Sequence, residues 1–224
     1  MKSKLTFLLF FVALTIGAQT RMAILGDSYS TYQGYITPAT NEPWYLCNND
    51  NPERTNVNDV TLTWWYQLIA QTGYRLEINN SYSGATICFT GYNGDDYQPR
   101  SIITRADNLG SPDVILVFGG TNASWANSPI GEYKYSGWTN EDLYNYRPAI
   151  CYLAEYLKNR YQGVKVFFII NTELKPEITD GIKHVCERYG HSFIELHDIT
   201  KMWGHPDING MKAICEQVKT ALEK

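Results

Sequence analysis

Short apolar runs alternate along the chain with longer amphipathic segments. Four of the runs have the length and the β-branched or aromatic content of buried strands, and a fifth is weaker. The four lie at 22–25, 113–118, 164–170 and 192–196, and the weaker one lies at 74–78. Runs that are apolar throughout are typical of strands covered on both faces.

Apolar residues recur at steps of three and four in the segments between these runs, which predicts amphipathic helices. The clearest series is Leu143, Tyr146, Ile150, Leu153 and Leu157. Further helices are expected at 61–72 and 178–189, with Gly73 and Gly190 as C-terminal stops, and at 208–222. Strands that alternate with helices indicate an α/β fold with a parallel sheet, right-handed crossovers and helices on both faces. No linker or repeat divides residues 19–224, which are expected to form one domain.

The first 18 residues have the layout of a secretory signal peptide. Two lysines precede an uncharged apolar run at 5–16, which ends at the small residues Gly17 and Ala18. The run is short for a membrane span, and a buried first helix is the alternative interpretation. No other long apolar run exists, so we expect no integral membrane segment after cleavage. The mature chain is predicted to be exported, to the periplasm or the extracellular space.

Composition and charge exclude several classes of protein. Of 224 residues, 44% are hydrophobic and 19% charged, which is too apolar for a disordered chain. The formal net charge is −4, and removal of the N-terminal Lys2 and Lys4 takes it to −6. A nucleic-acid-binding protein is expected to carry a basic stripe, and no run of lysine and arginine is present. Nucleic acid is therefore not an expected partner, and the sequence does not indicate an oligomeric state.

The cysteines suggest no metal site. The five are Cys47, Cys88, Cys151, Cys186 and Cys215. None forms a Cys-x-x-Cys pair, so zinc is not expected. The last three lie in helical patterns and are expected to be buried as small apolar residues. Cys47 and Cys88 lie in loop-like stretches, and since export favours oxidation, we hypothesise a disulfide between them.

A serine and a histidine stand where a parallel sheet binds ligands, beyond the carboxyl ends of its strands. Ser28 ends the sequence Gly26-Asp27-Ser28 directly after the first strand. A serine hydroxyl needs a base to become a nucleophile. Of the four histidines, His205 lies in a Trp-Gly-His-Pro turn just before the last helix, which places it at the same edge. We expect His205 to be the base.

Two further strand ends offer hydrogen-bond donors for an oxyanion. Gly84 follows the second strand, and a glycine lets its backbone N–H approach a reacting group closely. Asn122 follows Gly119 and Gly120 after the third strand, and its side-chain amide can donate as well. Each of these motifs alone is more often only a turn or a helix boundary. Their occurrence in this order, at successive strand ends, is far more specific.

In this order, Gly26-Asp-Ser28, Asn79-Asn-Ser-Tyr-Ser-Gly84, Gly119-Gly-Thr-Asn122 and His205-Pro resemble the SGNH, or GDSL-like, hydrolases. The resemblance covers essentially the whole mature chain. It implies a flavodoxin-like three-layer α/β/α sandwich with a five-stranded parallel sheet. It also implies ester hydrolysis through a serine acyl-enzyme, without metal or cofactor. Ser28 would be the nucleophile, His205 the base, and Ser28 N–H, Gly84 N–H and the Asn122 side chain the oxyanion hole.

One position departs from the pattern of the family. The family usually has Asp three residues before the histidine, where this chain has Met202. A triad aspartate holds the imidazole tautomer and stabilises the imidazolium. Three interpretations stay open. A backbone carbonyl near Met202 orients His205, which we favour; Asp198 takes the place of the acid; or the site is weakened and only binds. Asp207 is expected to cap the last helix.

Aromatic residues in the expected loops bear on the substrate. They are Trp44, Tyr45, Tyr92, Tyr97, Trp125, Tyr133, Tyr135, Trp138 and Trp203. Flat apolar faces with polar edges suit sugar rings, so we expect a small-molecule or glycan ester as substrate and carbohydrate deacetylation as the reaction. Nine of the 17 tyrosines lie in loops that follow strands, and we interpret the tyrosine excess chiefly as a feature of the active-site rim.

Two alternative functions stay open. An inactive glycan-binding protein is the first, and a lipase or acyl-hydrolase is the next. A nucleotide-binding protein is less favoured, because the first loop lacks a glycine-rich phosphate-binding sequence.

Overall fold

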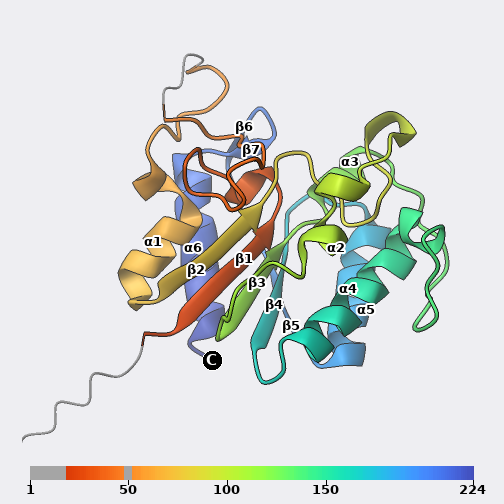
Figure 1. The fold of residues 1–224 in the computed structure, drawn as a ribbon. Helices are drawn as coiled ribbons and strands as arrows, with labels where there is room; N and C mark the ends of the chain where they lie inside the picture. The colour runs from red at the N-terminus through yellow and green to blue at the C-terminus, as the bar shows by residue number, and fades with distance from the viewer. Residues whose placement is uncertain (1–18, 48–51) are drawn as a thin grey trace, which may run out of the picture.

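Five parallel strands form one sheet, in the order β2-β1-β3-β4-β5 (Figure 1). The computed structural model describes residues 19–47 and 52–224, so the predicted signal peptide lies outside the described residues. The strands are β1 (Arg21–Gly26), β2 (Arg75–Ser81), β3 (Val114–Phe118), β4 (Lys165–Ile170) and β5 (Ser192–Glu195). All five predicted strands are confirmed, and the weakest of them is the longest, because β2 continues into the polar sequence Asn79-Asn80-Ser81.

The main helices follow the predicted segments closely. They are α1 (Trp64–Thr72), α4 (Tyr146–Arg160), α5 (Pro176–Tyr189) and α6 (Ile208–Leu222). Gly73 and Gly190 end α1 and α5 in the left-handed conformation, as predicted. Two short helices, α2 (Ile102–Arg105) and α3 (Thr121–Trp125), and a small antiparallel pair, β6 (Lys201–Met202) and β7 (His205–Pro206), were not predicted. Single 3-10 turns lie at Ser28–Ser30, Val60–Leu62, Tyr92–Gly94, Gln98–Arg100 and Asp142–Tyr144.

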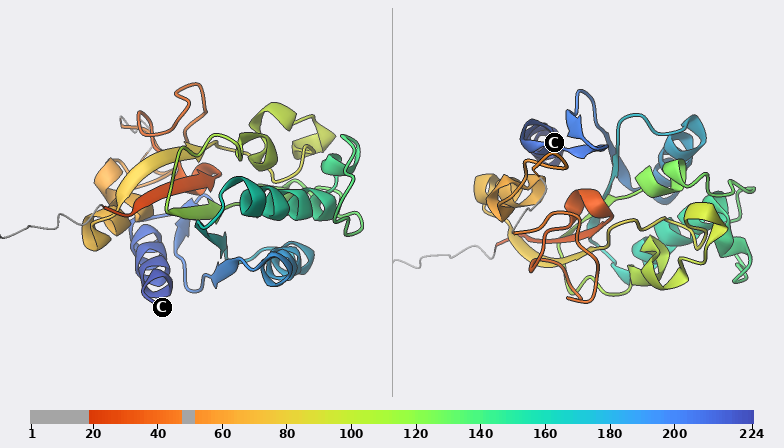
Figure 2. Two further views of the ribbon diagram at one scale, coloured as in Figure 1. Left: turned by 60° about the horizontal axis from the view of Figure 1, so that its bottom comes forward. Right: turned by 90° about the horizontal axis from the view of Figure 1, so that it is seen from above.

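Helices cover both faces of the sheet, so the fold is the expected three-layer α/β/α sandwich (Figure 2). In β1, Met22 and Ile24 enter the core beneath α1 and α6, whereas Ala23 and Leu25 enter the core beneath α2, α4 and α5. The alternation follows from the two-residue repeat of a strand, and it explains why the run is apolar throughout.

The strand order places the crevice of the fold beside β1. The chain passes from β1 to β2 on one side and then to β3 on the other, so the direction of winding reverses between β1 and β3. In open α/β sheets, ligands bind at such a switch point, outside the carboxyl ends of the strands. Figure 2 (right) looks onto this edge, where the loops after β1 and β2, helix α3 and the β6–β7 hairpin come together.

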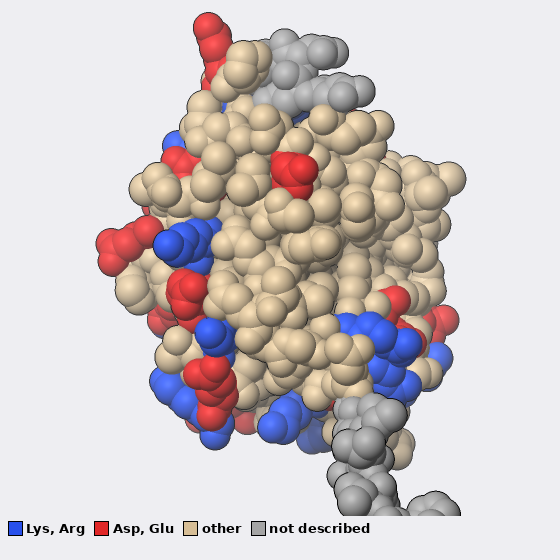
Figure 3. All heavy atoms as spheres, turned by 90° about the vertical axis from the view of Figure 1, so that its left-hand side faces the viewer, with Lys and Arg blue, Asp and Glu red and all other residues tan. Residues whose placement is uncertain are grey.

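The surface shows mixed charge on the side that carries α1. There, acidic and basic side chains surround a largely uncharged centre (Figure 3). Within 19–47 and 52–224, none of the helices has the length and apolarity needed to cross a bilayer.

The hypothesis of a Cys47–Cys88 disulfide is wrong. Both thiols are free. Cys47 is exposed and its Sγ lies 3.1 Å from Gln33 Oε1, whereas Cys88 is buried in the core beneath α4 and α5. The other three cysteines are buried, as predicted.

Candidate active site

The nucleophile candidate sits at the switch point. Gly26 ends β1 where no side chain fits, since a Cβ there would lie 2.7 Å from Ser81 Oγ and 2.9 Å from Ser30 Oγ. Asp27 N–H then donates to Phe118 O of β3 at 3.1 Å, which turns the chain over the sheet edge. Ser28 follows as the first residue of a 3-10 turn capped by the Asp27 side chain.

Ser28 and His205 meet across 177 residues of chain. His205 Nε2 lies 2.8 Å from Ser28 Oγ, and His205 Nδ1 lies 3.1 Å from the carbonyl oxygen of Trp203. A carbonyl only accepts, so Nδ1 carries the proton and Nε2 is free to accept from the serine hydroxyl. The arrangement is a Ser-His dyad in which a main-chain carbonyl fixes the tautomer of the base, which agrees with the favoured interpretation of the sequence.

The alternative that Asp198 acts as the triad acid is wrong. Its Oδ2 lies 2.9 Å from His197 Nδ1, and its side chain is 94% exposed. The residue has a positive φ of 54° and lies in the loop after β5. Asp207 has the predicted structural role, because its Oδ1 accepts from Gly210 N–H at the start of α6.

The imidazole of His205 is enclosed by aromatic rings. Trp44 stacks on it with centroids 3.5 Å apart and planes 8° apart, and the rings of Tyr29 and Trp125 lie 5.3 and 5.9 Å away. Burial, with smaller contributions from the positive charges of Arg54 and Lys201, lowers the pKa of His205 to about 4, against the opposing effect of the Trp203 carbonyl. The imidazole is therefore neutral at physiological pH, as the predicted general base must be.

The two further residues predicted to bind an oxyanion, Asn122 and Gly84, lie close together at this edge. Asn122, in the first turn of α3, donates from Nδ2 to Ala85 O at 3.0 Å, so its amide lies against the residue that follows Gly84. Gly84 has a φ of 78°, a conformation that only glycine adopts readily. Within the described residues, the backbone N–H groups of Gly84 and Ser28 have no hydrogen-bond acceptor. The structure thus places all four predicted residues at one edge of the sheet.

Tyr92 fixes the orientation of the Asn122 amide, and sequence reasoning missed this role. Its hydroxyl donates to Asn122 Oδ1 at 2.8 Å, while one Nδ2 hydrogen is used by Ala85 O. The second Nδ2 hydrogen remains for a ligand. Burial raises the pKa of Tyr92 to about 12, so the phenol stays a donor. A lone tyrosine in a glycine-rich loop gives no signal of this contact in the sequence.

A buried carboxyl and a buried guanidinium lie beneath the site. Asp27 is fully buried, and desolvation raises its pKa to about 7 although Tyr29 N–H and the charge of Arg105 act in the opposite direction. Burial lowers the pKa of Arg105 to about 9. Arg105 donates to the carbonyl oxygens of Gly26 and Asn80, so it ties α2 to the carboxyl ends of β1 and β2.

The aromatic residues predicted at the rim fall into two groups. Trp44 has both faces covered, one by His205 and the other by Arg54, whose Cζ lies 3.5 Å from the ring centroid. Tyr45 is buried and donates to Pro206 O. Others are packed down elsewhere, such as Tyr135 beneath Arg188, Tyr133 beneath Arg147 and Trp138 against Tyr152. Trp203 and Trp125, in contrast, are 74% and 42% exposed.

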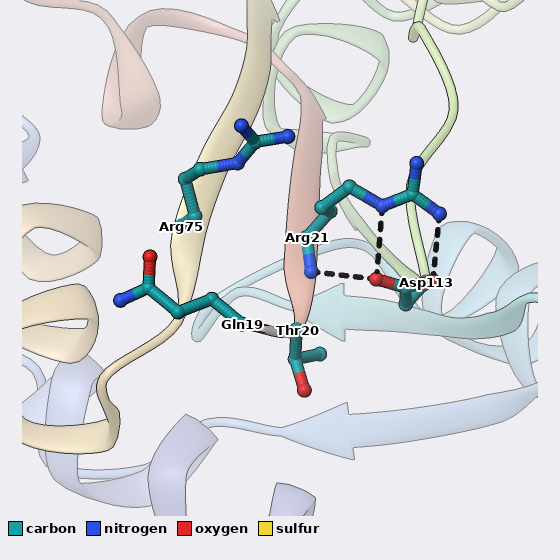
Figure 4. Close-up of a pocket in the computed structure, with 5 residues that line it drawn as sticks. All are labelled: Gln19, Thr20, Arg21, Arg75 and Asp113. Carbon is teal, nitrogen blue, oxygen red and sulfur yellow. Dashed lines mark hydrogen bonds and ion pairs between the residues drawn. The ribbon is translucent and has the colours of Figure 1, made fainter. Parts of the chain in front are cut away.

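A cavity of about 560 Å³ lies at the opposite edge of the sheet, away from these residues (Figure 4). It is lined by Gln19, Thr20, Arg21, Arg75 and Asp113. Its charged groups are already paired, Arg21 with Asp113 and Arg75 with Glu77, so it offers no reactive group. In the described part of the chain, no three His, Cys, Asp or Glu side chains gather as a metal site requires.

Comparison with known proteins identifies relatives over nearly the whole chain. The model of the GDSL-like lipase/acylhydrolase family matches residues 20–222. A protein from Bacteroides ovatus named as a GDSL-like lipase is 49% identical, with a TM-score of 0.90 over 92% of this chain and 99% of its own. A protein from Bacteroides uniformis, also named as a GDSL-like lipase, is 51% identical, with a TM-score of 0.89 over 92% of this chain and 96% of its own.

Two further comparisons bear on the fold and on curated proteins. An acetyl xylan esterase from Butyrivibrio proteoclasticus shares the fold, with a TM-score of 0.55 over 91% of this chain and 63% of its own, at 16% identity. A comparison with curated proteins gave no match.

Proposed function

Because the chain belongs to the GDSL-like lipase/acylhydrolase family of ester-hydrolysing enzymes, we propose that it is a serine esterase that removes acetyl or other small acyl groups from carbohydrate. The observation that carries the catalytic part is the 2.8 Å contact between Ser28 Oγ and His205 Nε2, in a tautomer set by the Trp203 carbonyl. This geometry supports a working nucleophile more than a site that only binds.

The reaction proceeds through an acyl-enzyme. His205 Nε2 takes the proton of Ser28 Oγ as the oxygen attacks the ester carbonyl. The oxyanion accepts hydrogen bonds from Ser28 N–H, Gly84 N–H and the free Nδ2 hydrogen of Asn122. The imidazolium then gives its proton to the leaving alcohol, and the acyl group stays on Ser28. Water, activated by the same imidazole, releases the acid and restores the serine.

The exposed indoles support carbohydrate as the carrier of the acyl group. Trp203 is in the turn of the hairpin that carries His205, and the Trp125 ring lies 5.9 Å from the His205 ring. Indole faces left open to solvent beside a nucleophile suit the C–H faces of a pyranose. The acetyl xylan esterase that shares the fold acts on such a substrate. From the first 18 residues we also propose export.

Labelling of Ser28 tests the catalytic proposal. A fluorophosphonate probe is expected to form an adduct on Ser28 that is absent in Ser28→Ala and strongly reduced in His205→Ala. Wild-type protein should also hydrolyse p-nitrophenyl acetate. If folded wild-type protein gives neither an adduct nor turnover, the catalytic proposal fails and a glycan-binding protein is favoured.

A substrate series tests the acyl and carbohydrate parts. We expect turnover of acetylated oligosaccharides, and kcat/KM on p-nitrophenyl esters that falls as the acyl chain lengthens from acetate to octanoate. A preference for octanoate, with no action on acetylated sugars, would identify a lipase or acyl-hydrolase instead.

A further inference from the structure

Three side chains form a stack at the base of the proposed dyad. The His205 imidazole lies against one face of the Trp44 indole, at 3.5 Å and 8°. The Arg54 guanidinium lies over an indole face at 3.5 Å from the ring centroid. Since the imidazole occupies one face, the order of the stack is His205, Trp44, Arg54. Trp44 is held in this place by its backbone N–H, which donates to Thr31 Oγ1 at 2.8 Å.

The stack occupies a site that lacks a carboxylate. His205 Nδ1 bonds to the Trp203 carbonyl, and Asp198 points to solvent. A carbonyl dipole fixes the tautomer, but it provides no full negative charge for the imidazolium that forms during acyl transfer. The stacked indole offers the negative face of its π system to that cation. Within the described residues, Arg54 has no ion pair, and its guanidinium lies over the indole.

We propose that Trp44 is a positioning residue that serves the imidazole in place of a triad acid, and that Arg54, on the far face of the same indole, limits how readily that imidazole takes a proton. The proposal rests on the proposed function of His205 as the base. The indole fixes the plane of the ring, so that Nε2 stays directed at Ser28 Oγ. Burial is the main reason that the imidazole is neutral in the free enzyme, and the positive charge of Arg54 on the far face of the indole adds to this effect.

The charges around His205 fix the sign of this effect. The cations are Arg54 and Lys201, both of which lower its pKa, and Lys201 is itself paired with Glu173. Tyr29 and Tyr45, which face the ring from the first loops, are uncharged because burial raises both pKa values. Asp27, buried one residue before Ser28, has a raised pKa. Removal of the Arg54 charge must therefore raise the pKa of His205.

The first test replaces Arg54 with methionine, which keeps an apolar chain over the indole. Arg188→Met is the matched control, because Arg188 lies over Tyr135 at 3.7 Å in the same kind of contact, away from the dyad. The titration of His205 is followed by NMR, its signal assigned by its loss in His205→Gln. We expect a rise of about half a pH unit or more in Arg54→Met and none in the control. An unmoved titration in Arg54→Met, or an equal shift in Arg188→Met, would overturn the role of Arg54.

The second test separates the ring of Trp44 from its bulk. At about pH 8, where the imidazole is neutral, Trp44→Leu is expected to lose kcat on p-nitrophenyl acetate by about tenfold, with little change in KM. Trp44→Phe, which keeps a ring on the imidazole, should recover most of the loss. Equal kcat in the two variants, or a loss that appears only in KM, would overturn the role of Trp44. Melting temperatures of both variants show whether either change is one of folding.

The two proposals fail in different ways. If wild-type protein shows neither Ser28 labelling nor turnover, the proposed function fails, while the NMR titration still tests the effect of Arg54 on His205. If wild-type protein is active, but Arg54→Met leaves the titration of His205 unchanged and Trp44→Leu and Trp44→Phe have equal kcat, only the proposed roles of Trp44 and Arg54 are refuted.

Discussion

At the residue scale, Asp27 is the most constrained group near the proposed dyad. Its Oδ1 accepts from Tyr29 N–H at 3.1 Å, and its Oδ2 has no hydrogen-bond partner within the described residues. Burying a charged carboxylate oxygen without a hydrogen-bond donor costs free energy, and a protonated carboxyl avoids this cost because it is uncharged. This is why desolvation is the largest cause of its raised pKa of about 7. The carboxyl caps the turn that presents Ser28 while holding its proton up to near-neutral pH.

We expect Asp27 to make the native state less stable as pH rises. Its pKa is about 7 in the folded chain against an ordinary 3.8, so the folded state binds more protons between these values. Stability from this group is complete below the unfolded pKa and is lost toward pH 7. Relative to Asp27→Asn, which cannot titrate, wild-type protein should lose on the order of 3 kcal/mol between about pH 5 and pH 8. Urea unfolding at the two pH values measures this difference. The same change in the free energy of unfolding with pH in both proteins would contradict it.

Tyr92 permits a second prediction at this scale. Tyr92→Phe removes the hydrogen bond to Asn122 Oδ1, so the amide is free to rotate away from the oxyanion. We expect kcat on p-nitrophenyl acetate to fall about tenfold, the equivalent of one hydrogen bond, with KM little changed. Tyr97→Phe is the control, since within the described chain the Tyr97 hydroxyl has no hydrogen-bond partner. Similar kinetics in both variants would remove Tyr92 from the site.

The sequence indicated which residues would gather at the candidate site better than it indicated the side chains that support them. Ser28, Gly84 and Asn122 each lie two to four residues after the end of a strand, and a strand end is visible as the point where an apolar run stops. Tyr92 and Trp44 act through side-chain contacts between loops that are far apart in the chain. Such contacts depend on loop paths, which no periodicity encodes, so Trp44 was interpreted as a surface for substrate although both its faces are covered.

At the element scale, the β6–β7 hairpin sets the geometry of the base. Its two-residue turn, Trp203-Gly204, has positive φ at both positions, 49° and 75°, which is the pattern of a type I′ turn. This turn directs the Trp203 carbonyl at His205 Nδ1. Tyr29 and Tyr45 fasten the hairpin, because their hydroxyls donate to the carbonyl oxygens of Gly204 and Pro206.

Gly204→Ala is expected to strain this turn and to impair catalysis. A Cβ at a φ of 75° costs about 1 kcal/mol, and here it would lie 3.0 Å from the Trp125 ring. Gly163→Ala is the matched control, since Gly163 has a φ of 77°, no atom within 4 Å of its Cβ position, and a place in the turn before β4. Both variants should melt at lower temperature, but only Gly204→Ala should lose kcat. An equal kcat in the two would show that the turn does not set the base.

The long elements were predictable and this hairpin was not. Five apolar runs and four amphipathic series carry many residues each, so their periodicity is distinct. The strands of the hairpin are two residues long and contain a proline, and its turn has Trp where Asn or Gly is usual. Between Lys201 and Pro206, only Gly204 matches the usual sequence of a hairpin. Its formation depends instead on the two tyrosine hydroxyls that hold it over the sheet.

At the scale of the whole molecule, the aromatic excess has more than one role. Of the loop tyrosines, Tyr29, Tyr32 and Tyr45 are buried in the core beneath α1 and α6, so the interpretation of the excess as a rim feature is wrong for them. Their rings pack in the core, and their hydroxyls donate to backbone carbonyl oxygens of Gly204, Asn58 and Pro206 in other segments. On the described β6–β7 hairpin and α3, the aromatic side chains exposed to solvent are Trp203 and Trp125. The proposal of a sugar substrate therefore rests on these two tryptophans.

The last prediction tests Trp203 as a contact for sugar. Trp203→Asn removes an indole that is 74% exposed, while Asn favours the positive φ of the turn and keeps the carbonyl that bonds His205. We expect kcat/KM for an acetylated oligosaccharide to fall about fivefold relative to kcat/KM for p-nitrophenyl acetate, the equivalent of one aromatic contact. Phe193→Thr removes an exposed ring from β5, far from the dyad, and should leave this ratio unchanged. A parallel loss on both substrates in Trp203→Asn would mean that the residue acts only through its backbone, and the sugar would then have to be bound elsewhere on the carboxyl edge.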